Sequence, residues 1–337
     1  MSRSFDDQHG TFVPLPDRHW QQLGIVLSDS CKEEADCLLE QGIEQYQIRN
    51  FAAALATLQR SLELYRSIQD FSGKGKALGA LGLIFYALGN YPDAIACSRQ
   101  SLDIAQRFND QGLERQSLAN LGNAYRHLND HSRAIDYKQK SLALARAAND
   151  RRGEMAALNN LGMAYKAIDD CWQAIDYYEQ SLTIARELND RALEGQILRN
   201  LGNAHHALAN YAKTVDCYEQ LLLIARQLPD YQSETQILKN LASACYATGD
   251  FHKAIEYHQQ RLDLARKQND RRSEEQVLEN LGVIYEGLGN YQQAIECYEA
   301  HLTVAQALQD HQLMQQAIAN IKTLCYAIGD YAKASRY

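Results

Sequence analysis

The sequence predicts an all-α protein, a solenoid of antiparallel helix pairs built from a 40-residue repeat. Three observations support this fold. Residues that can cap a helix recur twice in every repeat, the apolar residues between the caps follow helical spacing, and the 337 residues include only four prolines. Because so few prolines leave little room for turn-rich β structure, no strand is expected.

Two columns of capping residues divide each repeat into two helices. Ser, Asp and Asn carry a short side-chain oxygen that accepts a hydrogen bond from the free N–H groups of a helix start. The first column is Ser30, Asp70, Asp110, Asp150, Asp190, Asp230, Asp270 and Asp310. The second column is Asn50, Asn90, Asp130, Asp170, Asn210, Asp250, Asn290 and Asp330. Each repeat therefore holds a first helix (helix A), a tight turn and a second helix (helix B).

Both helices are expected to be amphipathic. Between Asp110 and Asp130, for example, Leu118, Leu121, Tyr125 and Leu128 recur at helical spacing. One pair of helices cannot bury two such faces, so neighbouring repeats must stack into a continuous core. A glycine recurs in helix A although it costs about 1 kcal/mol relative to alanine, which predicts close packing at that level. These glycines are Gly82, Gly122, Gly162, Gly202 and Gly282.

The repeat predicts two domains, a tail over residues 1–29 and a solenoid over residues 30–337. The seven full repeats are 30–69, 70–109, 110–149, 150–189, 190–229, 230–269 and 270–309, followed by a partial eighth. Residues 1–29 lack the repeat, but Trp20, Leu23 and Leu27 have helical spacing. We expect a frayed tail and a short capping helix there. The alternative is a tail that folds into the binding groove as an internal competitor.

The motif Leu121-Gly122-Asn123-Ala124-Tyr125, followed by a turn and Ala134-Ile135, resembles the tetratricopeptide repeat (TPR) signature. The resemblance covers residues 30–337 and implies a right-handed superhelix. The long helices and the Leu-Gly-Asn triads are most similar to the Leu-Gly-Asn mitotic scaffold family and to related bacterial arrays. Period alone would also fit HEAT-type helix pairs, but the Gly, Tyr and Ala columns favour the TPR fold.

A second stripe of helix A, beside its apolar face, is rich in carboxamides, and we call it the amide stripe. Its first column is Asn120, Asn160, Asn200, Asn240, Asn280 and Asn320. One turn earlier stand Gln116, Gln196, Gln236, Gln276 and Gln316, with Lys76 and Ala156 in the other two repeats. Three residues after the first column come Asn123 and Asn203. The TPR resemblance implies that this stripe lines a concave surface and that its asparagines hold peptide ligands.

A carboxamide both donates and accepts hydrogen bonds, so a row of carboxamides can bind the backbone of an extended chain. We therefore expect the amide stripe to bind a peptide. The alternative is that the asparagines bond to the neighbouring repeat and hold the solenoid in register. Two other columns are expected to form pairs between helices and solvated polar cover. They are Glu114, Glu154, Glu194, Glu234 and Glu274, and Arg146, Arg186, Arg226 and Arg266.

Charges beside the amide stripe predict the sign of the ligand. The middle repeats carry Arg126, Lys166, Arg199, Lys239 and His206. The first and seventh repeats carry Asp36, Glu40, Glu279 and Glu286. A basic middle speeds capture of an oppositely charged partner, so we expect an acidic peptide or a C-terminal carboxylate at repeats three to six. Long side chains that merely extend into solvent are the alternative.

Composition excludes several function classes. The formal charge of −8 argues against binding to nucleic acid or anionic membrane, and the start of the chain lacks the apolar stretch of a secretory signal, so a cytoplasmic protein is expected. The eight cysteines include no Cys-x-x-Cys pair, and those at Cys97, Cys217, Cys245, Cys297 and Cys325 fall in Tyr columns, which predicts buried apolar residues rather than metal ligands. No metal or cofactor is expected.

The leading hypothesis is thus a non-catalytic adaptor that binds protein or peptide. Motifs for serine hydrolases, zinc proteases and dinucleotide enzymes are missing. A sensor module that controls an effector enzyme is the second hypothesis, followed by RNA binding, which a monotonous stripe on an acidic chain disfavours. A hydrolase with an active site built from His205, His206 and Cys245 is supported only by the proximity of these residues in the sequence. Self-association through the ends of the array is a further expectation.

Overall fold

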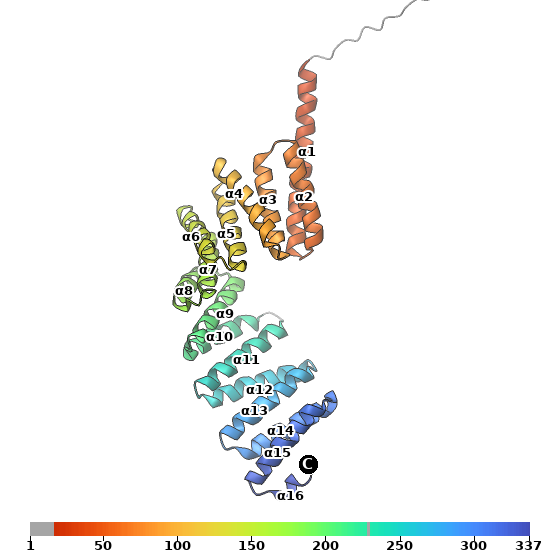
Figure 1. Cartoon of the computed structure of the whole chain (residues 1–337), viewed down its shortest axis with the longest axis vertical. Helices are drawn as coiled ribbons and strands as arrows, with labels where there is room; N and C mark the ends of the chain where they lie inside the picture. Colours follow the sequence, from red (N-terminus) through yellow and green to blue (C-terminus); the bar gives the residue numbers. More distant parts are fainter. Residues whose placement is uncertain (1–16, 228–229) are drawn as a thin grey trace, which may run out of the picture. The chain divides into compact units, whose positions relative to one another are not determined.

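The computed structural model describes residues 17–227 and 230–337. These residues form sixteen α-helices and no strand (Figure 1). They belong to two compact units, of which one ends at Asn160 and the other begins at Leu161. Within each unit consecutive helices pack side by side and are joined by tight turns. The predicted all-α solenoid of antiparallel helix pairs is confirmed.

The first unit contains six helices and the start of a seventh, with odd-numbered A helices and even-numbered B helices. They are α1 (Asp17–Gln47), α2 (Phe51–Ser67), α3 (Phe71–Ala87), α4 (Tyr91–Arg107), α5 (Gln111–His127), α6 (His131–Ala147) and α7 (Arg151–Lys166). The second unit contains the end of α7 and nine more helices. They are α8 (Cys171–Glu187), α9 (Arg191–Ala207), α10 (Tyr211–Ala225), α11 (Tyr231–Ala247), α12 (Phe251–Lys267), α13 (Arg271–Gly287), α14 (Tyr291–Leu308), α15 (His311–Ala327) and α16 (Tyr331–Ala334).

The predicted caps explain where these helices begin. Asp70 accepts a hydrogen bond from the N–H of Gly73 at 2.9 Å, and Asp110 accepts one from the N–H of Leu113 at 3.0 Å. Most other members of both columns make the same bond, whereas Asn290 makes no side-chain cap bond. Just before the cap the chain turns through a left-handed residue, for which glycine is suited, as at Gly89 with φ of 76°.

Ser30 is an exception to the capping prediction. Instead of starting a helix, it lies inside α1, which runs without a break from Asp17 to Gln47. Nothing ends the helix before Ser30, because residues 25–31 contain neither glycine nor proline. Residues 17–29 are therefore continuous with the first helix A. Residues 1–16 of the tail predicted at residues 1–29 lie outside the described residues.

The glycine column allows helices A and B of one repeat to approach closely. A Cβ atom built on Gly162 would lie 2.5 Å from the ring of Tyr178, and one on Gly282 would lie 2.5 Å from the ring of Tyr298. Both tyrosines are almost fully buried. The predicted close packing is confirmed, but Leu128, predicted on the apolar face, follows the end of α5 and is 46% exposed.

Candidate peptide-binding face

The first column of the amide stripe divides into two environments. Asn120 is buried, and its Nδ2 donates to the backbone oxygen of Gly79 in the preceding helix A at 3.3 Å. This contact holds neighbouring repeats in register, which is the structural role named above as the alternative to peptide binding. Asn160, Asn240 and Asn280 are only half-buried, as is Asn200. Asn120 is therefore buried against the preceding repeat, while these four later asparagines are only half-buried.

Asn123 and Asn203 serve the helix pairs. The side-chain oxygen of Asn123 accepts from Lys138 Nζ at 2.5 Å, and that of Asn203 accepts from the Tyr218 hydroxyl at 2.5 Å. Both donors lie on helix B of the same repeat. These contacts occupy the carboxamide oxygens, which leaves the Nδ2 hydrogens as the groups that a ligand could use.

The glutamine column is exposed at Gln116, Gln196, Gln236 and Gln276. Two of these side chains are oriented by neighbours. Gln236 Nε2 donates to Asn240 Oδ1 at 2.9 Å, and Gln276 Oε1 accepts from Arg261 Nη2 at 3.0 Å. The bond from Arg261 leaves the amide hydrogens of Gln276 free to donate outward.

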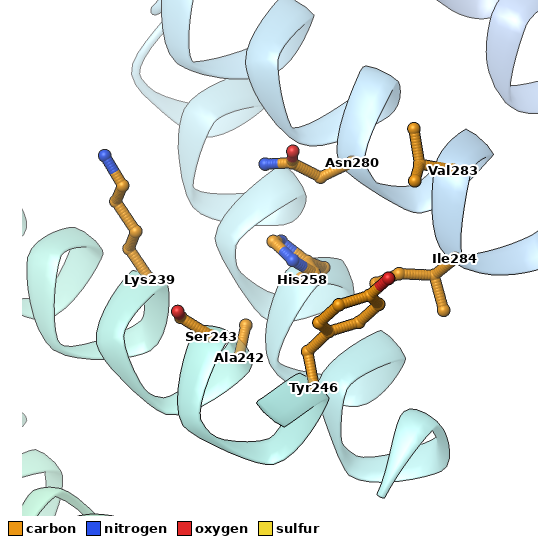
Figure 2. A pocket seen from close by; sticks show the side chains of 8 residues that line it. All are labelled: Lys239, Ala242, Ser243, Tyr246, His258, Asn280, Val283 and Ile284. Atoms are coloured by element: carbon orange, nitrogen blue, oxygen red, sulfur yellow. The ribbon is translucent and has the colours of Figure 1, made fainter. Parts of the chain in front are cut away.

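Two predicted site residues, Lys239 and Asn280, line one cavity of about 330 Å³ in the second unit. Figure 2 shows these two side chains around its polar end, together with His258 from α12. Tyr246 of α11 and Val283 of α13 lie toward the opposite, apolar end. The cavity thus combines donor groups with an apolar wall.

A break in the Gly/Tyr pattern accompanies this cavity. In three repeats a glycine of helix A faces a tyrosine of helix B, as at Gly202 and Tyr218. In the sixth repeat the corresponding residues are Ala242 and His258, and the shorter imidazole fills less space than a tyrosine. Both columns change together at this one repeat, and that joint change in the sequence is the signal from which the cavity could have been predicted.

Other members of the stripe line separate cavities. Gln196 and Arg199 border one of about 310 Å³ among α9, α10 and the start of α11. Gln116 borders one of about 210 Å³ in the first unit, where Lys76 also contributes. The structure therefore brings predicted residues together in groups of two rather than along one continuous trough.

The predicted cations lack carboxylate partners. Among the described residues Arg126, Lys166, Arg199 and Lys239 form no ion pair, and Arg199 and Lys239 are exposed. Three of the predicted acidic residues, by contrast, accept hydrogen bonds from within the protein. Asp36 accepts from the Tyr65 hydroxyl at 2.5 Å, Glu279 from Gln316 at 2.6 Å and Glu286 from the Tyr298 hydroxyl at 3.2 Å.

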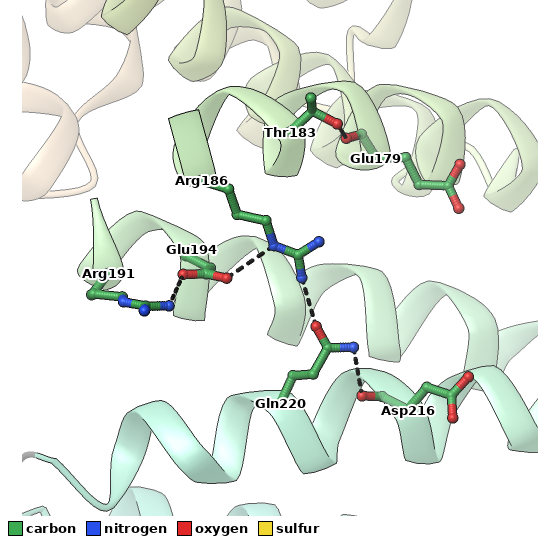
Figure 3. Close-up of polar contacts among 7 residues, drawn as sticks. All are labelled: Glu179, Thr183, Arg186, Arg191, Glu194, Asp216 and Gln220. Carbon is green, nitrogen blue, oxygen red and sulfur yellow. Dashed lines mark hydrogen bonds and ion pairs between the residues drawn. The ribbon is translucent and has the colours of Figure 1, made fainter. Parts of the chain in front are cut away.

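A second set of regularly spaced charges is fully engaged. Glu194 bonds to Arg186 Nε at 3.0 Å and to Arg191 Nη1 at 2.8 Å, and Arg186 Nη2 donates to Gln220 at 2.6 Å (Figure 3). The same pairing recurs at Arg226 with Glu234 and at Arg266 with Glu274. We call this set the Arg–Glu ladder. The predicted pairs between helices are confirmed, but Glu194 and Glu274 are buried rather than solvated.

Several buried basic side chains were not predicted from the sequence, among them Lys138, His258 and Arg261. Lys138 is 1% exposed, and burial followed by the charge of Arg126 lowers the pKa of its amine to about 7. His258 and Arg261 are also buried, one turn apart on α12. Burial, and to a lesser extent Arg261, lowers the pKa of His258 to about 4, so the imidazole is neutral at pH 7.

The cysteines and histidines form no metal cluster in the part of the chain that is described. Cys217, Cys245 and Cys325 are buried as predicted, whereas Cys97 and Cys297 are only half-buried, which corrects that prediction. In the column that Cys97 and Cys297 share, Tyr137 stacks on the ring of Tyr125. No described helix is both long and apolar enough to cross a membrane.

Comparison with known families identifies the class of protein. Tetratricopeptide repeat models match residues 39–107, 74–147, 139–187, 193–267 and 273–337. The chain therefore belongs to the tetratricopeptide repeat family. The narrower resemblance to the Leu-Gly-Asn scaffold proteins stays a prediction. Among curated proteins, none matches this chain.

Solved structures support the fold. The C-terminal part of a TPR repeat-containing protein from Cytophaga hutchinsonii is 13% identical with a TM-score of 0.61, covering 84% of this chain and 99% of its own. A signal transduction ATPase with numerous domains and a TPR sensor, from Pyrococcus horikoshii, is 18% identical with a TM-score of 0.61, covering 91% of this chain and 46% of that chain. A Rap protein complexed with Competence and Sporulation Factor is 18% identical with a TM-score of 0.56, covering 82% and 76%.

Proposed function

We propose that this protein is a non-catalytic adaptor that binds an extended, acidic segment of a partner protein along its amide stripe. A role in protein interaction is general for tetratricopeptide repeats. The observation that carries the acidic preference is the contrast in pairing. Arg199 and Lys239 are exposed beside two cavities and form no ion pair among the described residues, although Asp230 lines the same cavity as Arg199, whereas the arginines of the Arg–Glu ladder are all paired.

The carboxamides supply the rest of the recognition. Gln196 and Gln236 are exposed one turn before half-buried asparagines, so they offer donors and acceptors to a peptide backbone. Each such hydrogen bond contributes about 0.5–1.5 kcal/mol. Several of them together can bind the backbone of a peptide whatever its side chains are. The neighbouring cations then select for acidic residues.

A pull-down from the native cytoplasm tests the proposal. The intact chain is compared with an Asn200→Ala, Asn240→Ala double variant, and the captured proteins are identified by mass spectrometry. The proposal expects a partner that the intact chain retains and the variant loses. Lys213→Glu serves as a matched control, because the one ion pair of this exposed lysine within the described part of the chain is with Asp216 on helix B. Equal capture by the asparagine variant and the intact chain would contradict the proposal.

A second candidate is a sensor module that regulates an effector enzyme. It is favoured by the similarity to the TPR sensor of the Pyrococcus horikoshii ATPase, in which the matched region is 46% of the chain. Catalytic sequence in the same gene would support this candidate. A captured partner without catalytic activity, bound through the amide stripe, would favour the adaptor.

A further inference from the structure

The cavity of the sixth repeat has a floor unlike that of any other repeat. Two of the buried positions of α12 carry His258, which lines the cavity, and Arg261, one turn later. At the first position the other full repeats carry Leu58, Ser98, Lys138, Tyr178, Tyr218 and Tyr298, and at the second Ser61, Ser101, Ser141, Ser181, Leu221 and His301. Only the sixth repeat places two basic side chains there.

The floor is incomplete in its hydrogen bonding. His258 Nδ1 and Arg261 Nε and Nη1 are buried without any partner among the described residues. In the first two repeats the second position is satisfied, since the Ser61 and Ser101 hydroxyls donate to backbone oxygens at 2.8 and 2.9 Å, whereas His301 Nδ1 in the seventh repeat also lacks a partner in the described part of the chain. Buried donors without acceptors are costly, so an acceptor that reaches this floor would be bound favourably.

The charges around His258 all favour an anion. α11 contributes Lys239 and Tyr246 to the cavity lining. Arg261 of α12 lies outside the lining but close enough to act on His258, and Asp270 at the start of α13 acts in turn on Arg261. α13 contributes only the uncharged Asn280, Val283 and Ile284. The cavity lining contains no carboxylate, and Glu279 of α13 is engaged by Gln316.

We propose that this cavity receives a carboxylate of the partner segment and that His258 takes up a proton as the carboxylate binds. Lys239 and Asn280 hold the carboxylate at the cavity mouth, and Tyr246 and Val283 cover the apolar part of the same residue. In the free protein the imidazole stays neutral because it is buried near Arg261. A bound carboxylate adds the missing negative charge and favours the protonated imidazole. The inference rests on the proposed function.

Proton linkage makes the affinity depend on pH in one direction. A carboxylate that raises the pKa of His258 above its free value of about 4 makes binding tighter at pH 5.5 than at pH 7.5. The same change is measured as a net uptake of protons on binding at pH 6. Carboxylates of the ligand itself release protons on binding, so uptake has the opposite sign and is diagnostic.

Calorimetry with defined probes tests the inference. Decaglutamate with blocked ends offers only side-chain carboxylates, and decaglutamine with a free C-terminus offers only the terminal one. Titrations at pH 6 in two buffers of different ionisation enthalpy give the number of protons taken up. Uptake with the first probe identifies a side-chain carboxylate as the ligand, and uptake with the second identifies a C-terminal carboxylate. Uptake with neither overturns the inference.

Three variants assign the proton. His258→Gln keeps the cavity open but cannot be protonated, so it should abolish uptake. The double variant Ala242→Gly, His258→Tyr restores the pair that Gly202 and Tyr218 form, and should fill the cavity and lose both uptake and pH dependence. His205→Tyr is the matched control, because its column carries tyrosine in three other repeats, and it should retain uptake.

The ring signals of His258 provide an independent readout. Nuclear magnetic resonance of histidine-labelled protein should show the titration midpoint of His258 moving upward when decaglutamate is added. An unmoved midpoint with a bound probe overturns the inference and leaves the proposed adaptor intact, because the pull-down tests the adaptor separately.

Discussion

Two sets of charges in the second unit share the same 40-residue spacing but differ in their environment. In the Arg–Glu ladder each glutamate is held by at least one arginine at 2.8–3.0 Å, and Glu194 and Glu274 are buried. Beside the amide stripe, Arg199 and Lys239 are exposed and form no ion pair among the described residues. Regular spacing in the sequence therefore does not distinguish structural charges from candidate binding charges, whereas ion pairing in the folded protein does.

The largest expected effect concerns the ladder. Replacing Glu194 with alanine leaves Arg186 and Arg191 without their shared carboxylate, so we expect a loss of about 2–3 kcal/mol in unfolding free energy. Urea unfolding followed by circular dichroism measures it. The matched control is Asp216→Ala, whose pair with Lys213 is exposed on both sides and should change stability by less than about 0.5 kcal/mol. Equal losses of unfolding free energy in the Glu194→Ala and Asp216→Ala variants would mean that burial does not strengthen the Arg–Glu ladder.

Acid should destabilise the second unit through His258. Its folded pKa of about 4 lies below the unfolded value of 6.5, so the unfolded state binds the proton more readily and stability falls as the pH drops from about 6.5 toward 4. Between pH 7 and pH 5 the loss from this group is about 2 kcal/mol. His205, with a pKa also lowered by burial, acts in the same direction.

Comparing urea unfolding at the two pH values measures this loss. The Ala242→Gly, His258→Tyr variant should show a smaller loss than the parent, because tyrosine does not titrate in this range. A variant as acid-sensitive as the parent would show that the imidazole is not buried as described.

The two environments within the asparagine column make a third prediction. Asn120→Ala removes the bond to Gly79 and should lower unfolding free energy by about 1 kcal/mol, because the partner carbonyl stays buried. Asn280→Ala, at the cavity mouth, should leave stability within about 0.5 kcal/mol of the parent. Thermal unfolding of the two variants measures both losses of stability. A larger loss for Asn280→Ala than for Asn120→Ala would show that Asn120 does not hold the repeats in register.

The smallest expected effect is electrostatic. Reversing the charge at Arg199 and Lys239 should slow association with an acidic partner and flatten its salt dependence, because exposed charges steer encounter more than they add affinity. Stopped-flow association with the captured partner at low and high salt measures this. Lys213→Glu controls for net charge. An on-rate that is unchanged at every ionic strength would remove electrostatic selection from the proposed function.

Most of the fold could be predicted because its signals are local. A cap bond joins residues three apart, as between Asp110 and Leu113, and helical spacing is visible within one helix. The repeated Gly column anticipated the close approach of Gly162 to Tyr178. Ser30 failed as a cap because a helix start also requires that the preceding helix has ended, and no signal ends α1 there.

The candidate site was harder to predict, because its properties depend on contacts between repeats. The sequence by itself determined the period, the caps, the paired helices and the columns from which the site is built. Only the tertiary structure decided that Asn120 is buried against Gly79, 41 residues away, and that Arg186 reaches Gln220, 34 residues away. It also decided that Ala242 and His258 leave a cavity. The stacking of the helices determines which side chains meet across neighbouring repeats. These contacts in turn determine the partners, the burial and the pKa of each group.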